Sequence, residues 1–490
     1  MSANNEGFIH IDDLDQHAAD THRPTIAERQ RVDYREIAKE VGRLGEGKSY
    51  FIRTHGCQMN EHDTEIMSGM LEEMGYRPAK DMLDADFILY NTCAVRENAE
   101  VKVWGNLGTL KPLKAKNPNL IIGLCGCMAQ EDVVRERIRV THPHVDIVFG
   151  THNVHVLPSL IEQAHHSKET IFDVWDAAHE GTIENLPKVR KDDVRAWVNI
   201  QYGCNKFCTY CIVPFTRGEE RSRLPEDVVE EIKQLAEEGY KEITLLGQNV
   251  NDYGLDLGNV DFADLLELVA QVEGIERIRF TTSNPWNFTD KLIDTIARHK
   301  KIPNYIHLPV QSGSSQVLRR MKRGYTREEY LDLVNRIRTR IPDVALTTDI
   351  IVGFPGETEE QFQETVSLLE EVRYEGAYTF VYSPRAGTPA TRLQDDVTEA
   401  EKKQRLYRLN EVQDRISFEQ NQKLVGQVLE VLIDGKSKTN AEVLQARSES
   451  NKLVHLTGAD ELVGQLVHVK ITEAKTWYLR GEALPQGVQV

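Results

Sequence analysis

The spacing of apolar and polar residues predicts three folded units behind a polar N-terminus. Between residues 49 and 149, short apolar runs rich in Val, Ile and Leu alternate with helical stretches. Strands that alternate with helices favour an open parallel sheet, so we expect an α/β domain over residues 48–165. Residues 1–47 show no sustained apolar period, and we expect a flexible polar extension there, with one helix near residues 34–44.

Three cysteines in this first domain follow predicted strands. Because functional groups gather outside the carboxyl ends of parallel strands, we expect Cys57, Cys93 and Cys127 at one edge of the sheet. Cys125 is interpreted as a buried, inert residue. The four strands are predicted at residues 49–54, 86–90, 120–124 and 145–149.

A charged linker is expected over residues 166–189. Four histidines lie in or near it, and their polar surroundings indicate solvent-exposed side chains and not a metal site. These histidines are His152, His155, His165 and His166.

The central part of the chain, residues 190–421, repeats a strand and a helix about six times. Eight repeats would close a full barrel, so six favour a partial (β/α)6 barrel with its site at the carboxyl ends of the strands. A long helix over residues 399–423 leads into the last unit. Five short strands within residues 422–486 then predict a small β-barrel.

Composition limits where the protein works and how it meets nucleic acid. The 490 residues carry a net charge of −18, which counts against a broadly basic RNA-binding surface but allows a small docking module. Residues 422–490 carry eight Lys and Arg against eight Asp and Glu, and are thus the least repulsive region for phosphate. No apolar run reaches the ~20 residues of a membrane span and no secretory signal is visible, so we expect a cytoplasmic protein.

The most informative stretch holds Cys204, Cys208 and Cys211, at spacings of four and three. In a cytosol that keeps thiols reduced, such a group indicates a metal site, and thiolates hold iron–sulfur clusters. A zinc knuckle with a distant fourth ligand is the alternative, since only three ligands lie here. Three thiolates on a [4Fe–4S] cluster leave one iron open to a substrate. The loop, with Tyr210 before its third cysteine, resembles that of the radical S-adenosylmethionine (SAM) superfamily.

Cys57, Cys93 and Cys127 would form a second three-thiolate site with one open iron. This order of scattered cysteines, three-cysteine loop and terminal β-barrel is similar to the methylthiotransferase family of radical SAM enzymes, over residues 48 to about 485. The last barrel resembles a TRAM domain, which implies RNA binding. The motifs are Asn91-Thr92-Cys93, Gly126-Cys127-Met128-Ala129, residues 204–214, Leu308-Pro309-Val310-Gln311-Ser312-Gly313-Ser314 and Gly353-Phe354-Pro355-Gly356-Glu357.

The family has several branches. One modifies isopentenyladenosine at position 37 of tRNA, next to the anticodon; others modify threonylcarbamoyladenosine in tRNA or an aspartate of a ribosomal protein. Residues 217–223 and 246–254 resemble the isopentenyladenosine branch. The two other branches remain alternatives, as does a protein of a different class, a non-catalytic iron–sulfur RNA-binding protein.

The resemblance implies two [4Fe–4S] clusters, one on each cysteine group, and two SAM molecules per turnover. One SAM is cleaved to a 5′-deoxyadenosyl radical that removes hydrogen from C2 of adenine, and another methylates the sulfur carried by the second cluster. No catalytic side chain is assigned, because cofactors carry this chemistry. A reducing system such as flavodoxin or ferredoxin, a sulfur donor, a tRNA substrate and a monomeric state are expected.

Further side chains are candidates for binding SAM or RNA. We expect Tyr210, Gly247, Gln248, Asn249, Gly353 and Glu357 to hold SAM, with turn formation and strand capping as the alternative for the last five. Just past the cysteine loop, three arginines are candidates for contacting RNA phosphate or the SAM carboxylate, with a solvated basic face as the alternative. They are Arg217, Arg221 and Arg223.

Overall fold

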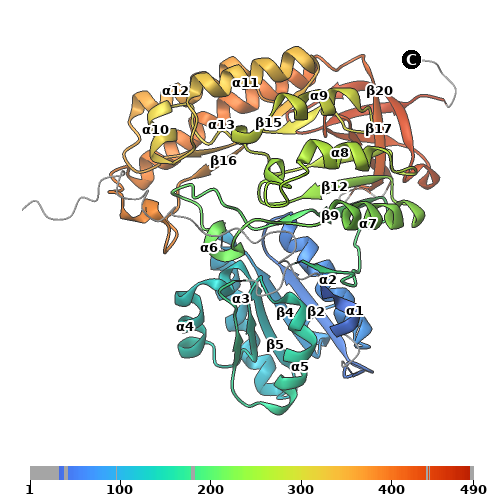
Figure 1. Ribbon diagram of the computed structural model, residues 1–490, viewed down its shortest axis with the longest axis vertical. Helices are drawn as coiled ribbons and strands as arrows, with labels where there is room; N and C mark the ends of the chain where they lie inside the picture. Colours follow the sequence, from blue (N-terminus) through green and yellow to red (C-terminus); the bar gives the residue numbers. More distant parts are fainter. Residues whose placement is uncertain are drawn as a thin grey trace, which may run out of the picture.

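The structure is a computed structural model that describes residues 32–37, 42–94, 97–177, 182–437, 440 and 442–485. Most of the predicted polar extension lies outside these residues; within it, strand β1 (Val32–Asp33) and the short helix α1 (Tyr34–Ile37) are described. Figure 1 shows the α/β unit, a larger central unit above it, and a β-barrel at the C-terminal end. Among the described helices, none is both long and apolar enough to cross a bilayer.

The N-terminal domain is the predicted open parallel sheet. Six strands pair in the order β3-β2-β4-β5-β6-β7, and every neighbouring pair is parallel. The two strands that the sequence did not predict lie at the edges and are very short, so they have no hydrophobic period to detect. The strands are β2 (Ser49–Thr54), β3 (Arg77–Pro78), β4 (Phe87–Thr92), β5 (Ile121–Gly126), β6 (Ile147–Phe149) and β7 (Ile171–Asp173).

Helices cover both faces of this sheet and bury two separate cores. Met67, Met70 and Leu160 belong to one core, and Leu107 and Ile138 to the other. Strands β4 and β5 are buried along their whole length, as expected for strands covered on both faces. The helices are α2 (Gln58–Glu73), α3 (Glu97–Lys116), α4 (Asp132–Thr141) and α5 (Leu157–His166), with 3₁₀ turns η4 (Met82–Asp84), η5 (Cys127–Gln130) and η6 (Val154–Val156).

Two predictions for the region after the fourth strand are wrong. The predicted linker contains β7, which completes the sheet, and β8 (Ile183–Glu184), which pairs in parallel with β1. His152 and His155 are buried, not solvent-exposed. The His155 ring packs edge-on against Trp175, with 5.5 Å between ring centroids.

The central unit has the six predicted parallel strands, arranged as two three-stranded sheets, β9-β12-β13 and β14-β15-β16. Their bounds are β9 (Arg195–Asn199), β12 (Glu242–Leu246), β13 (Arg277–Phe280), β14 (Tyr305–His307), β15 (Ala345–Val352) and β16 (Gly376–Val381). A small hairpin, β10 (Gln201–Tyr202) with β11 (Arg221–Ser222), closes off the cysteine loop.

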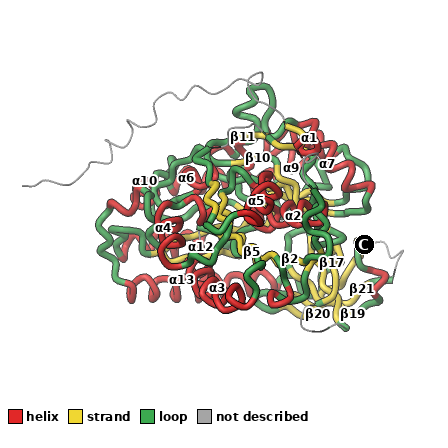
Figure 2. Tube along the Cα trace, turned by 90° about the horizontal axis from the view of Figure 1, so that it is seen from below, coloured by secondary structure: helices red, strands yellow, loops and turns green. Residues whose placement is uncertain are grey.

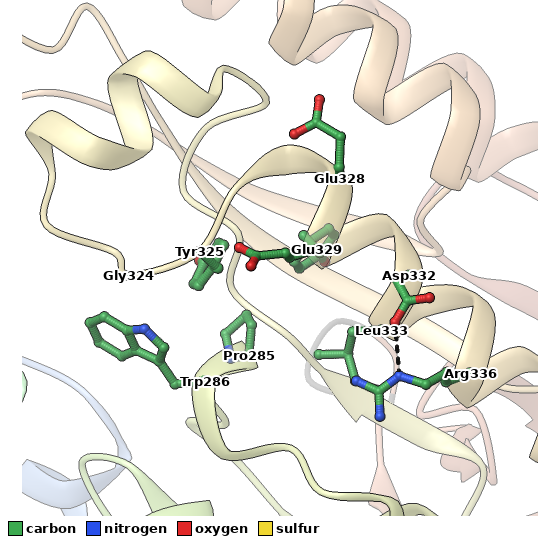
Figure 3. A pocket seen from close by; sticks show the side chains of 10 residues that line it. Pro285, Trp286, Gly324, Tyr325, Glu328, Glu329, Asp332, Leu333 and Arg336 are labelled. Atoms are coloured by element: carbon green, nitrogen blue, oxygen red, sulfur yellow. Dashed lines mark hydrogen bonds and ion pairs between the residues drawn. The ribbon is translucent and has the colours of Figure 1, made fainter.

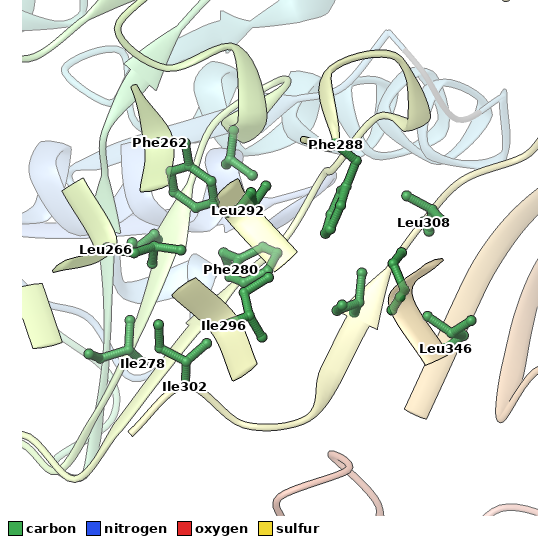
Figure 4. Packing of buried hydrophobic residues seen from close by; sticks show 14 of the residues in the cluster. Phe262, Leu266, Ile278, Phe280, Phe288, Leu292, Ile296, Ile302, Leu308 and Leu346 are labelled. Atoms are coloured by element: carbon green, nitrogen blue, oxygen red, sulfur yellow. The ribbon is translucent and has the colours of Figure 1, made fainter. Parts of the chain in front are cut away.

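One hydrophobic core joins the two sheets to their outer helices (Figure 4). Phe262 and Phe280 meet edge-on there, with 5.3 Å between ring centroids. The helices are α7 (Pro225–Glu237), α8 (Phe262–Ala270), α9 (Asp290–Arg298), α11 (Arg327–Arg340), α12 (Glu359–Val372) and α13 (Glu399–Gln422), with the short α6 (Val213–Arg217) and α10 (Ser315–Arg320) and the turns η7 (Val250–Asp252), η8 (Pro285–Asn287) and η9 (Pro389–Arg392).

The predicted C-terminal barrel of five strands is also present. It is closed in the order β17-β18-β19-β21-β20, and its yellow strands gather at one end of the molecule in Figure 2. The strands are β17 (Val428–Lys436), β18 (Val443–Ser448), β19 (Leu453–Thr457), β20 (Leu466–Ala474) and β21 (Leu479–Ala483), with the turn η10 (Asp460–Leu462).

Two arginines of β13 fasten this barrel to the central unit. The Arg277 guanidinium donates to the carbonyl oxygens of Arg447, at 2.7 Å, and Glu430, at 3.2 Å. Arg279 donates to the carbonyl oxygen of Ser448 at 2.8 Å. Both arginines are buried, so the joint is a packed interface and not a loose tether.

Candidate active site

The first thiol group, Cys204, Cys208 and Cys211, lies in the loop between β10 and α6, just beyond the carboxyl end of β9. All three thiols are free, and Cys204 and Cys208 are buried. Burial, and then the neighbouring Cys208, raise the pKa of the Cys211 thiol to about 12. Burial likewise raises the pKa of Cys204. Burial thus disfavours the thiolate form of Cys204 and Cys211, and the positive charge of a bound metal would favour it.

Backbone contacts fix the shape of this loop. Gly203 has a φ of 70°, and a Cβ there would lie 2.0 Å from the carbonyl oxygen of Glu219, so only glycine fits. The Asn205 backbone N–H donates to the Glu220 carboxylate at 3.0 Å, and the Glu220 N–H donates back to the Asn205 side chain at 3.2 Å. The three cysteines are therefore presented on a rigid turn.

Two N–H groups already point at sulfur atoms of this group. The Lys206 backbone N–H lies 3.4 Å from Cys204 Sγ, and Arg323 Nη1 lies 3.3 Å from Cys208 Sγ. Hydrogen bonds to sulfur are what tune iron–sulfur clusters. In the described part of the chain, no three Cys, His, Asp or Glu side chains lie close enough together to hold a single metal ion.

The second thiol group comes from three neighbouring strand ends. Thr54 pairs with Asn91, and Thr92 with Gly126, so the residues after β2, β4 and β5 meet at one edge. A Cβ placed on Gly56 would lie 3.0 Å from Cys93 Cβ, which shows how closely the segment of Cys57 passes Cys93. The structure thus brings Cys57, Cys93 and Cys127 together.

A network of amides and hydroxyls holds these strand ends in place. The Asn60 Nδ2 group donates to Asn91 Oδ1 at 3.0 Å and to the carbonyl oxygen of Thr92 at 3.1 Å. The Asn91 Nδ2 group donates to Thr64 Oγ1 at 3.0 Å. The Cys57 thiol donates to Asn60 Oδ1 at 3.3 Å, so the first cysteine is tied into the same network.

Cys125 is outside both groups, as expected. It is 1% exposed, belongs to the apolar core under α2, and its Sγ lies 3.7 Å from Met67 Sδ. Alternation along a strand would put residues 125 and 127 on one face, but β5 ends at Gly126, whose φ is 91°, and Cys127 begins the turn η5, so Cys127 leaves the face on which Cys125 packs.

The residue next to the first thiol group contacts the second group across the domain boundary. Ile212, which directly follows Cys211, packs in one buried cluster with Cys127 and Ala94. From α6, the buried Arg217 reaches Asp63 of α2, with 3.0 Å between Nη2 and Oδ2. Its guanidinium also interacts with the Cys127 thiol and lies within electrostatic reach of Cys57.

Buried polar atoms without partners mark the carboxyl ends of the barrel strands. Both side-chain polar atoms of Asn249, and both of Gln201, are buried and have no hydrogen-bond partner among the described residues; the hydroxyl of Ser283 is in the same state. Gly247 follows β12 and lies close to the Gln201 side chain, since a Cβ there would lie 3.4 Å from Gln201 Oε1. Unpaired buried groups are costly, and a polar ligand such as SAM would satisfy them.

The other predicted SAM contacts have structural partners. The Gly353 N–H donates to Glu357 Oε2 at 2.7 Å, and Arg405 binds the same oxygen at 2.9 Å. Glu357 Oε1 is buried with no partner among the described residues. Burial raises the pKa of Glu357, and Gly353 and Arg405 oppose this. Tyr210 packs beside Phe354 in a small apolar cluster.

Two of the three predicted RNA contacts are inside the protein. Arg217 and Arg223 are buried; Arg223 Nη2 lies 2.6 Å from Glu184 Oε2 and its Nη1 lies 2.7 Å from Glu231 Oε2. Arg221 is half-buried beside the Tyr202 ring, with 5.7 Å from Cζ to the ring centroid. An RNA role therefore does not fit Arg217 and Arg223, whose charges are met by carboxylates.

A cavity of about 520 Å³ is lined by the turn at Pro285 and Trp286, by Gly324 and Tyr325, and by the first turns of α11 (Figure 3). From α11, Glu328, Glu329 and Asp332 contribute to its wall. Trp286 also packs near Lys206 of the cysteine loop, with 5.3 Å from Nζ to the ring centroid. This cavity was not predicted from the sequence, because its walls combine η8 with the start of α11, about 40 residues further along the chain.

Comparison with known proteins agrees with this arrangement. Family models match at residues 49–150 (Uncharacterized protein family UPF0004), 198–369 (Radical SAM superfamily) and 422–484 (TRAM domain). Among solved structures, a radical S-adenosylmethionine methyltransferase, TsrM, from Kitasatospora setae has a similar fold, with a TM-score of 0.52 at 13% identity over 78% of this chain and 80% of that one.

Curated relatives match over nearly the whole chain. A tRNA-2-methylthio-N(6)-dimethylallyladenosine synthase from Geobacillus thermodenitrificans is 55% identical over 93% of this chain and 87% of its own length. One of the same name from Bacillus cytotoxicus is 55% identical over 93% and 89%. This chain therefore belongs to the tRNA-2-methylthio-N(6)-dimethylallyladenosine synthase family within the radical SAM superfamily.

Proposed function

We propose that this chain is a transferase that inserts sulfur and a methyl group at C2 of N6-isopentenyladenosine, at position 37 of tRNA next to the anticodon. The observation that carries the proposal is the packing of Ile212, which directly follows Cys211 of the first three-thiol group, against Cys127 of the second. Relatives that share 55% of its residues carry the matching name.

Cys204, Cys208 and Cys211 would hold one [4Fe–4S] cluster beside the site for SAM. When bound, the cluster and SAM supply one-electron chemistry that activates a C–H bond beyond the reach of a side-chain acid or base. Gln201 and Asn249 would bind polar groups of SAM; this assignment is supported by their buried side-chain atoms, which have no hydrogen-bond partner in the part of the chain that the structure describes. Tyr210, Gly247 and Gln248 shape the same strand ends.

Cys57, Cys93 and Cys127 would hold a second [4Fe–4S] cluster, which would supply the chemistry for sulfur insertion. Ile212 and Ala94 exclude water from the boundary between the two groups, since both side chains are buried there. Exclusion of water protects reactive species in a site of this kind. Glu357 and Gly353 support the first group indirectly, by fixing the loop after β15.

The substrate reaches this site as a folded tRNA. The TRAM-type barrel supplies RNA binding, and Arg221 remains a candidate for contacting phosphate because it is the most exposed of the three predicted arginines. A flavodoxin or ferredoxin supplies electrons, a separate donor supplies sulfur, and the enzyme works in the cytoplasm as a monomer.

The proposal is tested by product analysis with protein reconstituted under anaerobic conditions. The mixture contains dithionite, SAM and tRNA carrying isopentenyladenosine, and nucleosides and SAM products are measured by mass spectrometry. We expect 2-methylthio-isopentenyladenosine together with 5′-deoxyadenosine. Cys208→Ala abolishes both products, whereas Cys125→Ala, the matched cysteine outside both groups, retains them.

Other outcomes separate the alternatives. If SAM is cleaved but this tRNA stays unmodified, the substrate is threonylcarbamoyladenosine in tRNA or a ribosomal-protein aspartate. If both clusters are intact and reduced but SAM is never cleaved, the protein is a non-catalytic iron–sulfur RNA-binding protein and the proposal fails.

A further inference from the structure

Each thiol group faces its own buried arginine. Arg323, 4% exposed, donates from Nη1 to Cys208 Sγ at 3.3 Å and from Nη2 to the carbonyl oxygen of Pro309 at 2.9 Å. Arg217, 6% exposed, lies at the second group beside Cys127. Each guanidinium group thus lies beside one cysteine of a thiol group, although the two arginines come from different parts of the chain.

The backbone that carries Arg217 is fixed at both ends. On its N-terminal side, Ile212 is packed into the cluster with Cys127. On its C-terminal side, Gly218 has a φ of 70°, and a Cβ there would lie 2.9 Å from the His152 ring. Helix α6 therefore cannot turn away, and Arg217 is held facing the second thiol group.

Asp63 completes the arrangement at the second group. Its Oδ2 accepts the hydrogen bond from Arg217 Nη2 at 3.0 Å, and the carboxyl is 8% exposed. A buried carboxylate is stable only beside a positive charge, so Arg217 and Asp63 depend on each other. The thiol group thus meets a buried positive charge directly, with one negative charge behind it.

Buried charges act strongly on a redox centre. The interaction between two charges grows as the effective dielectric constant falls, and reduction potentials of iron–sulfur clusters follow the local charge and the hydrogen bonds to sulfur. A fixed positive charge favours the reduced form, which carries one more electron. A fixed negative charge at the same site disfavours it.

We propose that Arg217 is a positioning residue that raises the reduction potential of a cluster held by Cys57, Cys93 and Cys127, with Asp63 as its counter-charge. This inference rests on the second cluster of the proposed function. Arg323 plays the corresponding part at Cys208 and serves as the matched control.

The test isolates each cluster before its potential is measured. A variant with Cys204, Cys208 and Cys211 changed to Ala keeps only the second thiol group, and a variant with Cys57, Cys93 and Cys127 changed to Ala keeps only the first. Iron content is measured first, and the potential is then measured by a redox titration followed by electron paramagnetic resonance. Neither readout depends on turnover.

Opposite shifts are expected from the two partners of the ion pair. Arg217→Met is expected to lower the ratio of reduced to oxidised second cluster at a fixed potential at least tenfold. For one electron, this change corresponds to a reduction potential that is lower by 59 mV. Asp63→Asn raises it, and Arg217→Lys restores most of the Arg217→Met loss. Arg323→Met lowers the potential of the first cluster and leaves the second unchanged.

The outcomes separate this inference from the proposed function. If the second group alone binds no iron, the proposed second cluster is wrong, and the inference falls with it. If it binds iron but Arg217→Met leaves the potential unchanged, the cluster stands and the inference is overturned. Where Arg217→Met does not retain iron, Asp63→Asn decides, because a fall in potential there contradicts the role given to the ion pair.

Discussion

Ile212 and Cys127 pack against each other in one buried cluster, although they lie 85 positions apart in the chain. Ile212 directly follows the last cysteine of the first thiol group, and Cys127 belongs to the second. The contact therefore links two groups that are contributed by different domains. Neither group reaches its final environment until the two domains have packed together.

Ile212→Ala is expected to destabilise the iron-free protein by about 2–4 kcal/mol, because it leaves a cavity in a packed boundary. Urea unfolding measures this change. The matched control is Val140→Ala on the outer face of α4, where the side chain is 70% exposed and a change within about 0.5 kcal/mol is expected. Equal effects of the two substitutions would contradict the buried contact.

Asn249→Leu is expected to stabilise the ligand-free protein by up to about 1 kcal/mol, since it removes two buried polar atoms that have no partner among the described residues. The same change should weaken SAM binding by the reconstituted protein at least tenfold. Urea unfolding and equilibrium binding measure the two effects.

Asn251→Leu is the control for this prediction. Asn251 is buried nearby, but its side chain exchanges hydrogen bonds with the Asn284 backbone, at 2.6 Å and 2.8 Å. Its replacement should destabilise the protein by about 2–3 kcal/mol, because it leaves backbone groups unpaired. Similar losses of stability for both variants would show that the Asn249 side chain already has hydrogen-bond partners in the ligand-free protein.

Gly126→Ala is expected to disrupt the second thiol group. Gly126 has a φ of 91°, and a Cβ there would lie 2.3 Å from the carbonyl oxygen of Thr92, so β5 must shift just before Cys127. Iron bound by the second group should fall by at least half. Gly105→Ala in α3 meets nothing within 4 Å and should be neutral or stabilising. Normal iron content in Gly126→Ala would show that the glycine at residue 126 is not needed to place Cys127.

Glu131 gives a pH dependence to stability. Burial, and then Glu100, raise the pKa of its carboxyl from the usual 4.5 to about 7. Between these pH values the folded protein binds more protons than the unfolded chain, so the free energy of unfolding falls as pH rises from about 4.5 to about 7. The expected loss is about 1–3 kcal/mol.

Urea unfolding of iron-free protein at pH 5 and pH 8 measures this loss. Glu131→Gln should remove most of it, and at pH 8 this variant should be more stable than the parent. Glu136→Gln, at an exposed position of α4, is the control and should change nothing. A pH dependence that survives in Glu131→Gln would place its origin elsewhere.

The sequence predicted the parts of the fold that leave a local pattern. Strands β4 and β5 contain continuous apolar runs. Cys204, Cys208 and Cys211 lie within one short segment, so their spacing can be read directly from the sequence. Strand β7 was not predicted because it is three residues long and lies on the sheet edge. No period can mark so short a strand.

The parts that were missed depend on contacts between distant residues. Arg217 and Arg223 look like surface charges in a run of polar residues, and only the fold shows that Asp63 and Glu184 meet them inside. Gln201 offered a weak signal, as a polar residue in an apolar strand. Its lack of a partner, which points to a ligand, could be seen only with the strand ends in place.

The joint made by Arg277 and Arg279 bears on how a substrate nucleotide is chosen. Because these arginines bind backbone carbonyls of the C-terminal barrel, the barrel sits at a set distance from the two thiol groups. For an RNA that docks on this barrel, the distance from the docked segment to the thiol groups is then fixed by the protein. The nucleotide that reaches the thiol groups is selected by its distance along the RNA as well as by the shape of its base.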